Sequence, residues 1–344
     1  MRKSANWYGV IGAPADVGHV GCGAAAGPAG LRAGGLLRRL GQVGLVADMG
    51  DVAGPTYDGA VDVSGCRSMA QTATWCGAVR DRVGRVLATG GFPIMMGGDH
   101  SLALGSIAAA SAHTKAQGRA FHVLWFDAHP DFNTPETSPS GNTHGLPAAT
   151  ACGFGHPLML GVGAFTPLLQ PAHLEQFGIR DVDPGERANL QAAGIRFHEM
   201  PTVRALGLPA LVAGALARIA ATGGGHVHVS FDLDVLDPAV APGVGTPVPE
   251  GLDLASAEIA MRMLGASGLV GSLDLVEFAA RHDREGRTAS VAERLLAGFI
   301  AARNAVGRSA MTPSGPGRVM AVASGRQGCY FRQPCSRPSG RHPA

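Results

Sequence analysis

The segment from Trp125 to Asn133, WFDAHPDFN, places three ionisable side chains at alternate positions directly after an apolar run, FHVLWF. Asp127, His129 and Asp131 would share one face of the chain if the strand continued. Such groups are rarely buried unless they are paired or bound to a metal. The spacing therefore predicts a charged partner for these three residues.

Three other apolar runs are also followed by acids and histidines. FPIMM leads into Asp99 and His100, HVHVSF leads into Asp232, Asp234 and Asp237, and SLDLV leads into Glu277. In parallel α/β sheets, ligands bind outside the carboxyl ends of the strands, where the connecting loops present free side chains. We therefore expect four strands to deliver these residues to one edge of a sheet.

A cluster of carboxylates at that edge would repel itself unless cations lay among them. Four carboxylates and two neutral imidazoles, with a formal charge of −4, match two divalent cations: Asp127, Asp131, Asp232, Asp234, His100 and His129. Oxygen ligands with some imidazole and no thiolate favour Mn²⁺ over Zn²⁺, although Fe²⁺ and Co²⁺ also fit. Two such ions close together can share a bridging hydroxide and make it available near neutral pH.

The elements that must position these residues follow an alternating pattern, which predicts βαβ units and a parallel sheet. The expected strands are 8–13, 44–50, 92–97, 121–126, 157–162, 226–231 and 269–278, and the expected helices include 27–40, 68–88, 101–117 and 208–223. The predicted fold class is a three-layer α/β/α arrangement with a mainly parallel central sheet. Because the periodicity ends near residue 306, we expect one domain over 1–306 and an irregular or disordered tail over 307–344.

Composition narrows the class of partner. The 344 residues carry a formal net charge of +2, with acids and bases spread along the chain, which argues against nucleic acid or anionic lipid as a partner. No signal-like segment and no run of about 20 apolar residues is visible. The six cysteines show neither zinc spacing nor a compact disulfide framework. We therefore expect a cytoplasmic protein that acts on a small molecule and does not bind a membrane.

A series of motifs resembles the ureohydrolases, binuclear manganese enzymes that release urea from guanidino compounds. The motifs are GGDHS at 97–101, DAHPD at 127–131, SGNTHG at 140–145, SFDLDVLDP at 230–238, GTP at 245–247 and LVE at 275–277. Their order and spacing match from about residue 8 to 305, and IRDVDPGE at 179–186 resembles the segment typical of the arginases. The resemblance implies an arginase/deacetylase-like fold and a homo-trimer or homo-hexamer. It also implies hydrolysis of L-arginine to L-ornithine and urea by a hydroxide that bridges two Mn²⁺ per subunit.

The resemblance assigns the six candidate ligands to two manganese ions that share two carboxylates. One ion would be held by His100, Asp127, Asp131 and Asp232. The other would be held by Asp127, His129, Asp232 and Asp234. The hydroxide would lie between the ions and would be oriented by Asp131.

The remaining matches imply roles toward the substrate. His144 would carry protons, either to the departing amine or from solvent, and Glu277 would pair with the guanidinium. The α-carboxylate would be contacted by Asn133, Ser138 and Ser140, and the α-ammonium by Asp183 and Glu186. A guanidinium stays protonated at physiological pH, so its carbon is a poor electrophile and needs a nucleophile stronger than water.

Other readings of the same residues stay open. Another ureohydrolase could act on agmatine, a guanidino acid or formiminoglutamate, and a non-catalytic relative could use the fold as a scaffold. A single-zinc deacetylase of related architecture needs only one Asp-x-His site, so His100, Asp131 and Asp234 argue against it. Asp183 and Glu186 could also simply charge the first turn of a helix.

Overall fold

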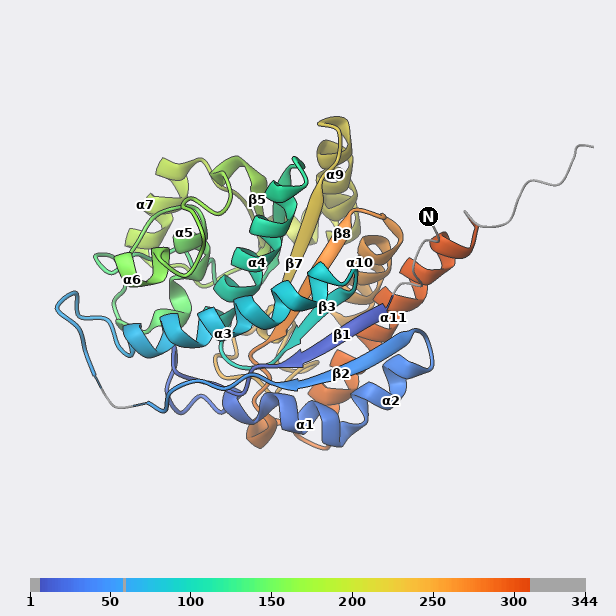
Figure 1. Cartoon of the computed structure of the whole chain (residues 1–344), viewed down its shortest axis with the longest axis horizontal. Helices are drawn as coiled ribbons and strands as arrows, with labels where there is room; N and C mark the ends of the chain where they lie inside the picture. The colour runs from blue at the N-terminus through green and yellow to red at the C-terminus, as the bar shows by residue number, and fades with distance from the viewer. Residues whose placement is uncertain (1–6, 58–59, 310–344) are drawn as a thin grey trace, which may run out of the picture.

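The computed structural model describes residues 7–57 and 60–309. Within these residues one eight-stranded sheet has the order β2-β1-β3-β8-β7-β4-β5-β6, and all of its strand pairs are parallel (Figure 1). The strands are β1 (Trp7–Gly12), β2 (Leu45–Asp51), β3 (Phe92–Met96), β4 (Phe121–Phe126), β5 (Leu174–Ile179), β6 (Arg196–Glu199), β7 (His226–Asp232) and β8 (Val270–Val276).

Helices cover both faces of this sheet. One face packs against α1 (Gly27–Gly34), α2 (Leu36–Gly41), α8 (Met200–Leu206), α9 (Leu208–Ala221), α10 (Leu254–Ala266) and α11 (Arg287–Ser309). The other packs against α3 (Met69–Ala88), α4 (Ala103–Ala116), α5 (Pro147–Ala151), α6 (Pro157–Leu160) and α7 (Pro184–Ala193). The predicted three-layer α/β/α class is confirmed, and the sheet is parallel throughout.

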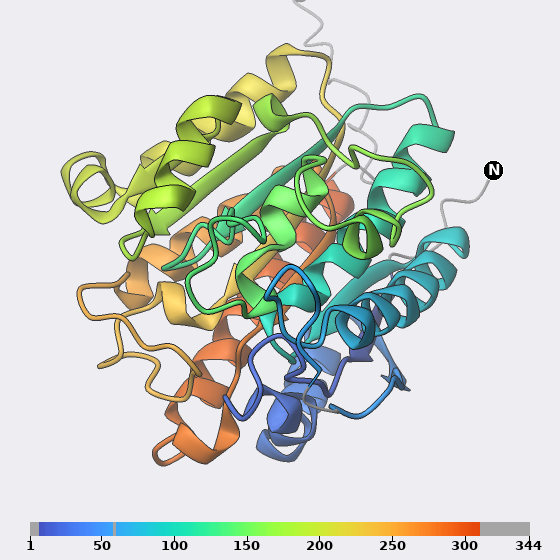
Figure 2. The ribbon, with the colours of Figure 1, turned by 90° about the vertical axis from the view of Figure 1, so that its left-hand side faces the viewer.

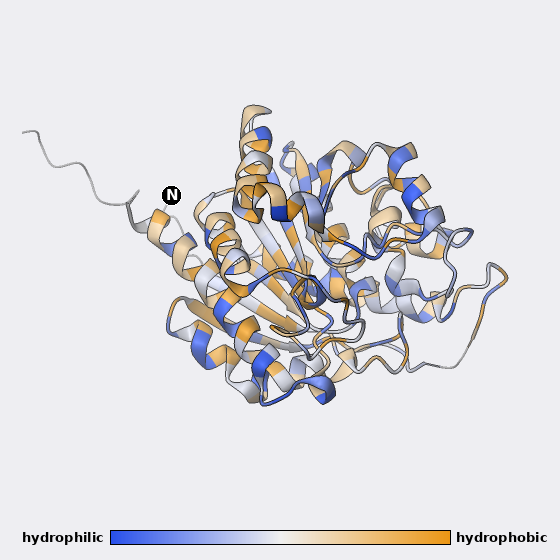
Figure 3. Cartoon of the chain, turned by 180° about the vertical axis from the view of Figure 1, so that it is seen from behind, coloured by the Kyte–Doolittle hydropathy of each residue, from blue (hydrophilic) through white to orange (hydrophobic). Residues whose placement is uncertain are grey.

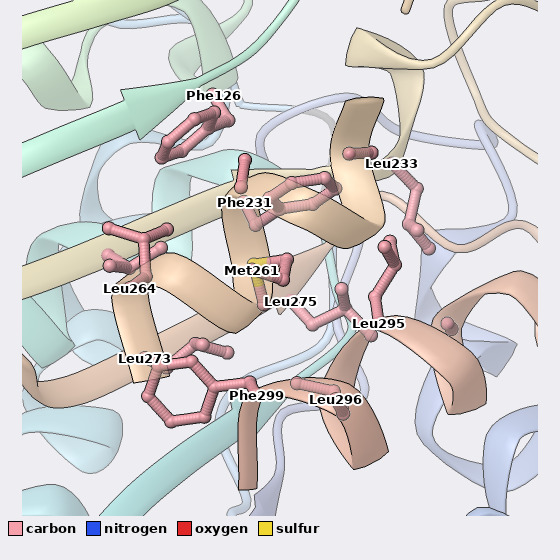
Figure 4. Packing of buried hydrophobic residues seen from close by; sticks show 14 of the residues in the cluster. Phe126, Phe231, Leu233, Met261, Leu264, Leu273, Leu275, Leu295, Leu296 and Phe299 are labelled. Atoms are coloured by element: carbon pink, nitrogen blue, oxygen red, sulfur yellow. The ribbon is translucent and has the colours of Figure 1, made fainter. Parts of the chain in front are cut away.

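Alternation along each strand supplies the two buried layers. On β4, Leu124 and Phe126 belong to the hydrophobic cluster on one face, whereas Val123 and Trp125 belong to the cluster on the other. This is the period of two expected for a strand that is buried on both sides. Figure 4 shows Phe126 near Phe231, in one cluster that continues through side chains of α10 to those of α11. The central strands are largely hydrophobic in Figure 3.

Three expectations about the elements were wrong. The strand expected at 157–162 is the short helix α6, because the side chain of His156 caps its first turn and Pro157 occupies the first helical position. The helix expected at 27–40 is divided into α1 and α2 at Gly35, which has φ +100°. The sequence analysis also missed β5 and β6.

The C-terminal part of the described chain is helical beyond the expected boundary. Helix α11 continues to Ser309 and so includes the first three residues of the expected tail, 307–309. The rest of that tail, 310–344, lies outside the described residues, so the boundary stays a prediction. Among the described helices, none is by itself long and apolar enough to cross a membrane; α8 and α9 meet that test only as a pair bent by 92°.

The strand order places four strands where the candidate residues are needed. β3, β8, β7 and β4 are consecutive neighbours in the sheet, and the loops that follow them lie at its carboxyl edge, which faces the viewer in Figure 2. These are the strands that precede His100, Glu277, Asp232 and Asp127.

Candidate metal centre

His100 lies among carboxylates contributed by the neighbouring strands. Its Nδ1 is 2.9 Å from Asp127 Oδ2, 3.1 Å from Asp232 Oδ2 and 3.3 Å from Asp131 Oδ2. Its Nε2 lies 2.9 Å from the hydroxyl of Ser230, so one ring nitrogen has a protein partner. Nδ1 is buried and makes no hydrogen bond within the described residues. Three carboxylate oxygens therefore converge on one imidazole nitrogen in a place that excludes water.

A second group adjoins the first and shares Asp127 with it. The Nδ1 of His129 lies 3.2 Å from Asp234 Oδ2 and 3.4 Å from Asp127 Oδ1. The ligand atoms of His100, Asp127 and Asp232 lie within 4.8 Å of one another, and so do those of Asp127, His129 and Asp234. The structure thus brings the predicted ligands together as two neighbouring groups.

These groups fit divalent cations on chemical grounds. With no cation among them, burial and the charge of Asp127 raise the pKa of Asp131 well above its ordinary value, and burial and Asp234 do the same to Asp232. Buried carboxylates that crowd one another in this way need either protons or cations to offset their charge. The donors are carboxylate oxygens and imidazole nitrogens without thiolate, a set suited to hard or borderline divalent metals.

Local hydrogen bonds hold the carboxylates in place. Trp125 Nε1 donates to Asp127 Oδ2 at 2.9 Å, and the indole stacks on His100 with ring centres 4.0 Å apart. The hydroxyl of Thr246 donates to Asp234 Oδ2 at 2.9 Å, and the backbone amide of Asp234 donates to Asp232 Oδ1 at 2.7 Å. Asp127, Asp232 and Asp234 are therefore each oriented by a partner outside the cluster or by the backbone next to them.

Two acids of the site have left-handed backbone conformations, which residues other than glycine rarely adopt. Asp131 has φ +50° and Glu277 has φ +62°. Such positions cost about 1–3 kcal/mol each and persist where the surrounding structure enforces them. At Glu277, the backbone amide donates to the carbonyl of Gly98 at 3.0 Å, and the backbone amide of His100 donates to the side-chain Oε1 at 2.8 Å.

Glu277 is buried beside the first group and faces His144. Its Oε1 accepts a 2.8 Å hydrogen bond from the backbone amide of His100 and lies 3.6 Å from His144 Nδ1. Burial raises the pKa of Glu277, but His144 and the His100 amide more than offset this, so the pKa lies below its ordinary value. An ionised carboxylate at this position can receive a guanidinium.

A cavity opens above the second group and contains the predicted substrate contacts. Its lining residues are His129, Asp131, Asn133, Ser138, Ser140, Asn142, His144, Gly145, Asp181, Asp183 and Glu186. Of the residues assigned to the substrate, only Glu277 is absent from this lining, because it lies deeper.

Asp183 and Glu186 also organise the start of α7. Asp183 is the N-cap, and the two residues form a capping box. Glu186 Oε1 accepts from the amide of Phe132 at 2.7 Å and Oε2 from the amide of Asp183 at 3.4 Å. Burial raises the pKa of Glu186 to about 7. Both oxygens of Glu186 are thus used within the protein. Asp183 Oδ2 accepts from the side-chain amide of Asn133 at 3.0 Å.

The sequence analysis missed one wall of the site. The loop after β1, residues 13–23, places the ring of His19 against His144, with centres 4.6 Å apart, and the Cys22 sulfur 3.9 Å from Glu277 Oε2. The segment GVIGAPADVGHVGCG contains these residues, but its glycines match no nucleotide-binding pattern and it lies far along the chain from the ligands. The one feature of the sequence that could have placed this loop at the site is that it follows an expected strand of the same sheet.

Comparisons with known proteins agree with this geometry. The family model described as "Arginase family" matches residues 7–301. An arginase of Bacillus caldovelox is 37% identical over 290 residues, which cover 83% of this chain and 95% of that protein. An arginase of Bacillus subtilis (strain 168) is 34% identical over 85% of this chain and 96% of that protein. The solved structure of the Bacillus caldovelox arginase superposes with a TM-score of 0.81 at 35% identity, covering 86% of this chain and 98% of that one. The chain therefore belongs to the arginase family.

Proposed function

We propose that this protein hydrolyses the guanidinium group of L-arginine to L-ornithine and urea, with two Mn²⁺ per subunit. The relatives named arginase match over most of the chain, and a solved arginase of Entamoeba histolytica with a TM-score of 0.79 holds L-ornithine. The observation that carries the proposal is the buried Nδ1 of His100. It faces three carboxylates, has no hydrogen-bond partner in the part of the chain that the structure describes, and lies beside a second group that shares Asp127.

The metal ligands would divide as the resemblance to the ureohydrolases implies. His100, Asp127, Asp131 and Asp232 would hold one ion, and Asp127, His129, Asp232 and Asp234 the other. Mn²⁺ is favoured because the donors are mostly carboxylate oxygens and include imidazoles. When bound, two such ions would lower the pKa of a water molecule shared between them and stabilise negative charge that develops during attack.

The protein's own groups would then bind, orient and protonate. Glu277, buried and ionised, pairs with the guanidinium and holds its carbon toward the ligand cluster. Asp131, next to both His100 and the cavity, accepts a hydrogen bond from the attacking water and orients it. His144, which lines the cavity and lies 3.6 Å from Glu277, is placed to protonate the departing amine.

The outer part of the cavity suits the amino acid end of arginine. Asp183 offers a carboxylate to the α-ammonium, while Asn133, Ser138 and Ser140 offer amide and hydroxyl groups to the α-carboxylate. Glu186 supports the site chiefly by bonding the backbone of Phe132 and Asp183. We also propose a homo-trimer or homo-hexamer and a cytoplasmic location; light scattering of the purified protein and cell fractionation test these two points.

The decisive experiment is urea release by the manganese-loaded protein from a panel of guanidino substrates. We expect arginine to be turned over with a higher kcat/KM than agmatine, guanidino acids or formiminoglutamate. Faster turnover of agmatine would overturn the substrate assignment, because agmatine lacks the α-carboxylate for which the serines are assigned. Tight arginine binding without urea release would instead favour the scaffold reading, and one zinc per chain would favour the deacetylase reading.

A further inference from the structure

Two imidazole rings lie against each other beside the substrate cavity, and the mechanism above uses only one of them. The ring centres of His19 and His144 are 4.6 Å apart and the ring planes are inclined by 31°. His144 lines the cavity and faces Glu277, whereas His19 comes from the loop formed by residues 13–23. The question is what a second titratable ring does at this position.

The contact between the two rings is set by the backbone. The amide of His144 donates to the carbonyl of Gly18 at 3.2 Å, and the amide of Gly18 donates to Asp99 Oδ2 at 2.8 Å. A Cβ at position 18 would lie 2.4 Å from Asp99 Oδ1 and 2.9 Å from the backbone nitrogen of His144. Only glycine allows so close an approach, so His19 is held next to His144 by the path of the loop.

The environment of His19 suits a group that accepts and releases protons. Its Nδ1 is buried without a hydrogen-bond partner among the described residues, although the residue as a whole is only partly buried. A buried polar atom without a protein partner is normally satisfied by solvent or a ligand. Burial and then His144 lower the pKa of His19; His129 adds to this effect, and Glu277 and Asp16 oppose it. His19 is therefore mainly neutral near pH 7 and free to take a proton.

We propose that His19 is a proton relay that passes protons between solvent and His144 during turnover. The inference rests on the proposed function, because it requires His144 to exchange a proton in every cycle. Hydrolysis is proton-neutral overall, since a guanidinium and water become urea and an alkylammonium. Within the cycle, the attacking water gives up two protons, and the leaving nitrogen takes two to become an alkylammonium. One proton crosses within the site, where His144 delivers it to the departing amine. The other leaves the water before attack and passes through His144 to neutral His19, which releases it to solvent; solvent returns one proton to the amine after it departs.

His19 touches none of the reacting atoms, so the test must separate proton relay from simple packing. In His19→Phe an aromatic ring still lies against His144 but cannot carry a proton, and His19→Gln keeps a polar side chain without a ring. In dilute buffer, both variants of the full manganese-loaded protein are expected to release urea about tenfold more slowly at saturating arginine. KM should stay within about twofold, because substrate contacts are kept. Concentrated imidazole buffer is expected to restore the variants' kcat and to leave the wild-type rate unchanged.

The matched control is His173→Phe, which alters another pair of histidine rings in contact. The rings of His122 and His173 have centres 4.3 Å apart at the opposite edge of the sheet, where β4 begins. This variant should show no dependence on buffer concentration. The relay is overturned if both His19 variants keep the wild-type rate in dilute buffer, or if their loss of rate does not respond to imidazole. A wild type that releases no urea from any guanidino substrate would refute the proposed function and the relay together, whereas an active wild type with unaltered variants refutes the relay alone.

Discussion

Replacing Arg180 with lysine should weaken the support behind the second group of metal ligands. The guanidinium of Arg180 donates to six backbone carbonyls, at distances from 2.7 to 3.4 Å: Gly178, Asp234, Val235, Leu236, Val248 and Pro249. It thereby ties the end of β5 to the turn that contains Asp234 and to the loop after Thr246. Burial lowers the pKa of Arg180, and Asp234 is the largest of the opposing charges.

The magnitude follows from counting donors. The guanidinium serves the six carbonyls with five N–H donors, so at least one donor is shared, and a lysine ammonium has three, so at least two donors are lost. Each hydrogen bond to a charged group contributes about 1.5–3 kcal/mol, but the site is partly exposed and water replaces part of this. We therefore expect Arg180→Lys to lower the free energy of unfolding by about 3 kcal/mol. For about 300 structured residues this corresponds to a fall in Tm of about 5 °C.

Urea unfolding followed by circular dichroism, at one protein concentration and in the presence of chelator, measures this difference. Arg204→Lys is the matched control, because Arg204 is half exposed and, among the described residues, its hydrogen bonds go to Glu250. This variant should change stability by less than about 0.5 kcal/mol. We also expect Arg180→Lys to bind the second manganese more weakly, since the carbonyl of Asp234 loses its 2.7 Å bond. Equal stability of Arg180→Lys and wild type, or equal losses in the two lysine variants, would show that the carbonyl network contributes nothing.

Three further predictions concern pH, metal and substrate. Burial and then His228 lower the pKa of His226 to about 3. Below pH 6.5 the unfolded chain therefore binds a proton at this histidine that the folded chain does not bind. The free energy of unfolding should fall by about 1.4 kcal/mol per pH unit from pH 6.5 toward pH 3, and urea titrations should show a shallower fall for His226→Gln. Chelation of the metal should lower Tm. Free Mn²⁺ at 100 times its Kd should raise the free energy of unfolding again by about 2.7 kcal/mol per site, and thermal unfolding with and without metal measures this difference. Ser138→Ala should raise KM for arginine about tenfold and leave KM for agmatine unchanged, because agmatine has no carboxylate; equal rises for both substrates would remove Ser138 from carboxylate binding.

The alternation of strands and helices could be predicted from the local pattern of apolar residues. The three-layer arrangement followed from that alternation. The run FHVLWF is confirmed residue for residue as β4, since a fully buried strand leaves a continuous apolar run. β5 escaped notice because Glu175 and Gln176 interrupt its apolar character, yet both are buried and bonded, Glu175 to His198 and Arg218, and Gln176 to the carbonyl of Pro130. Their partners lie on other segments, so local hydropathy could not identify this strand.

The sequence by itself determined which side chains stand at the carboxyl ends of the strands, because a parallel sheet brings those ends to one edge whatever the loops do. Ligand type and spacing at Asp127, His129 and Asp131 needed no tertiary information. Only the tertiary structure decided that His19 lies against His144 and that Arg180 reaches six carbonyls. Those contacts depend on the paths of loops from distant parts of the chain, and a loop's path is set by backbone hydrogen bonds and close approaches that no local pattern of residue types records.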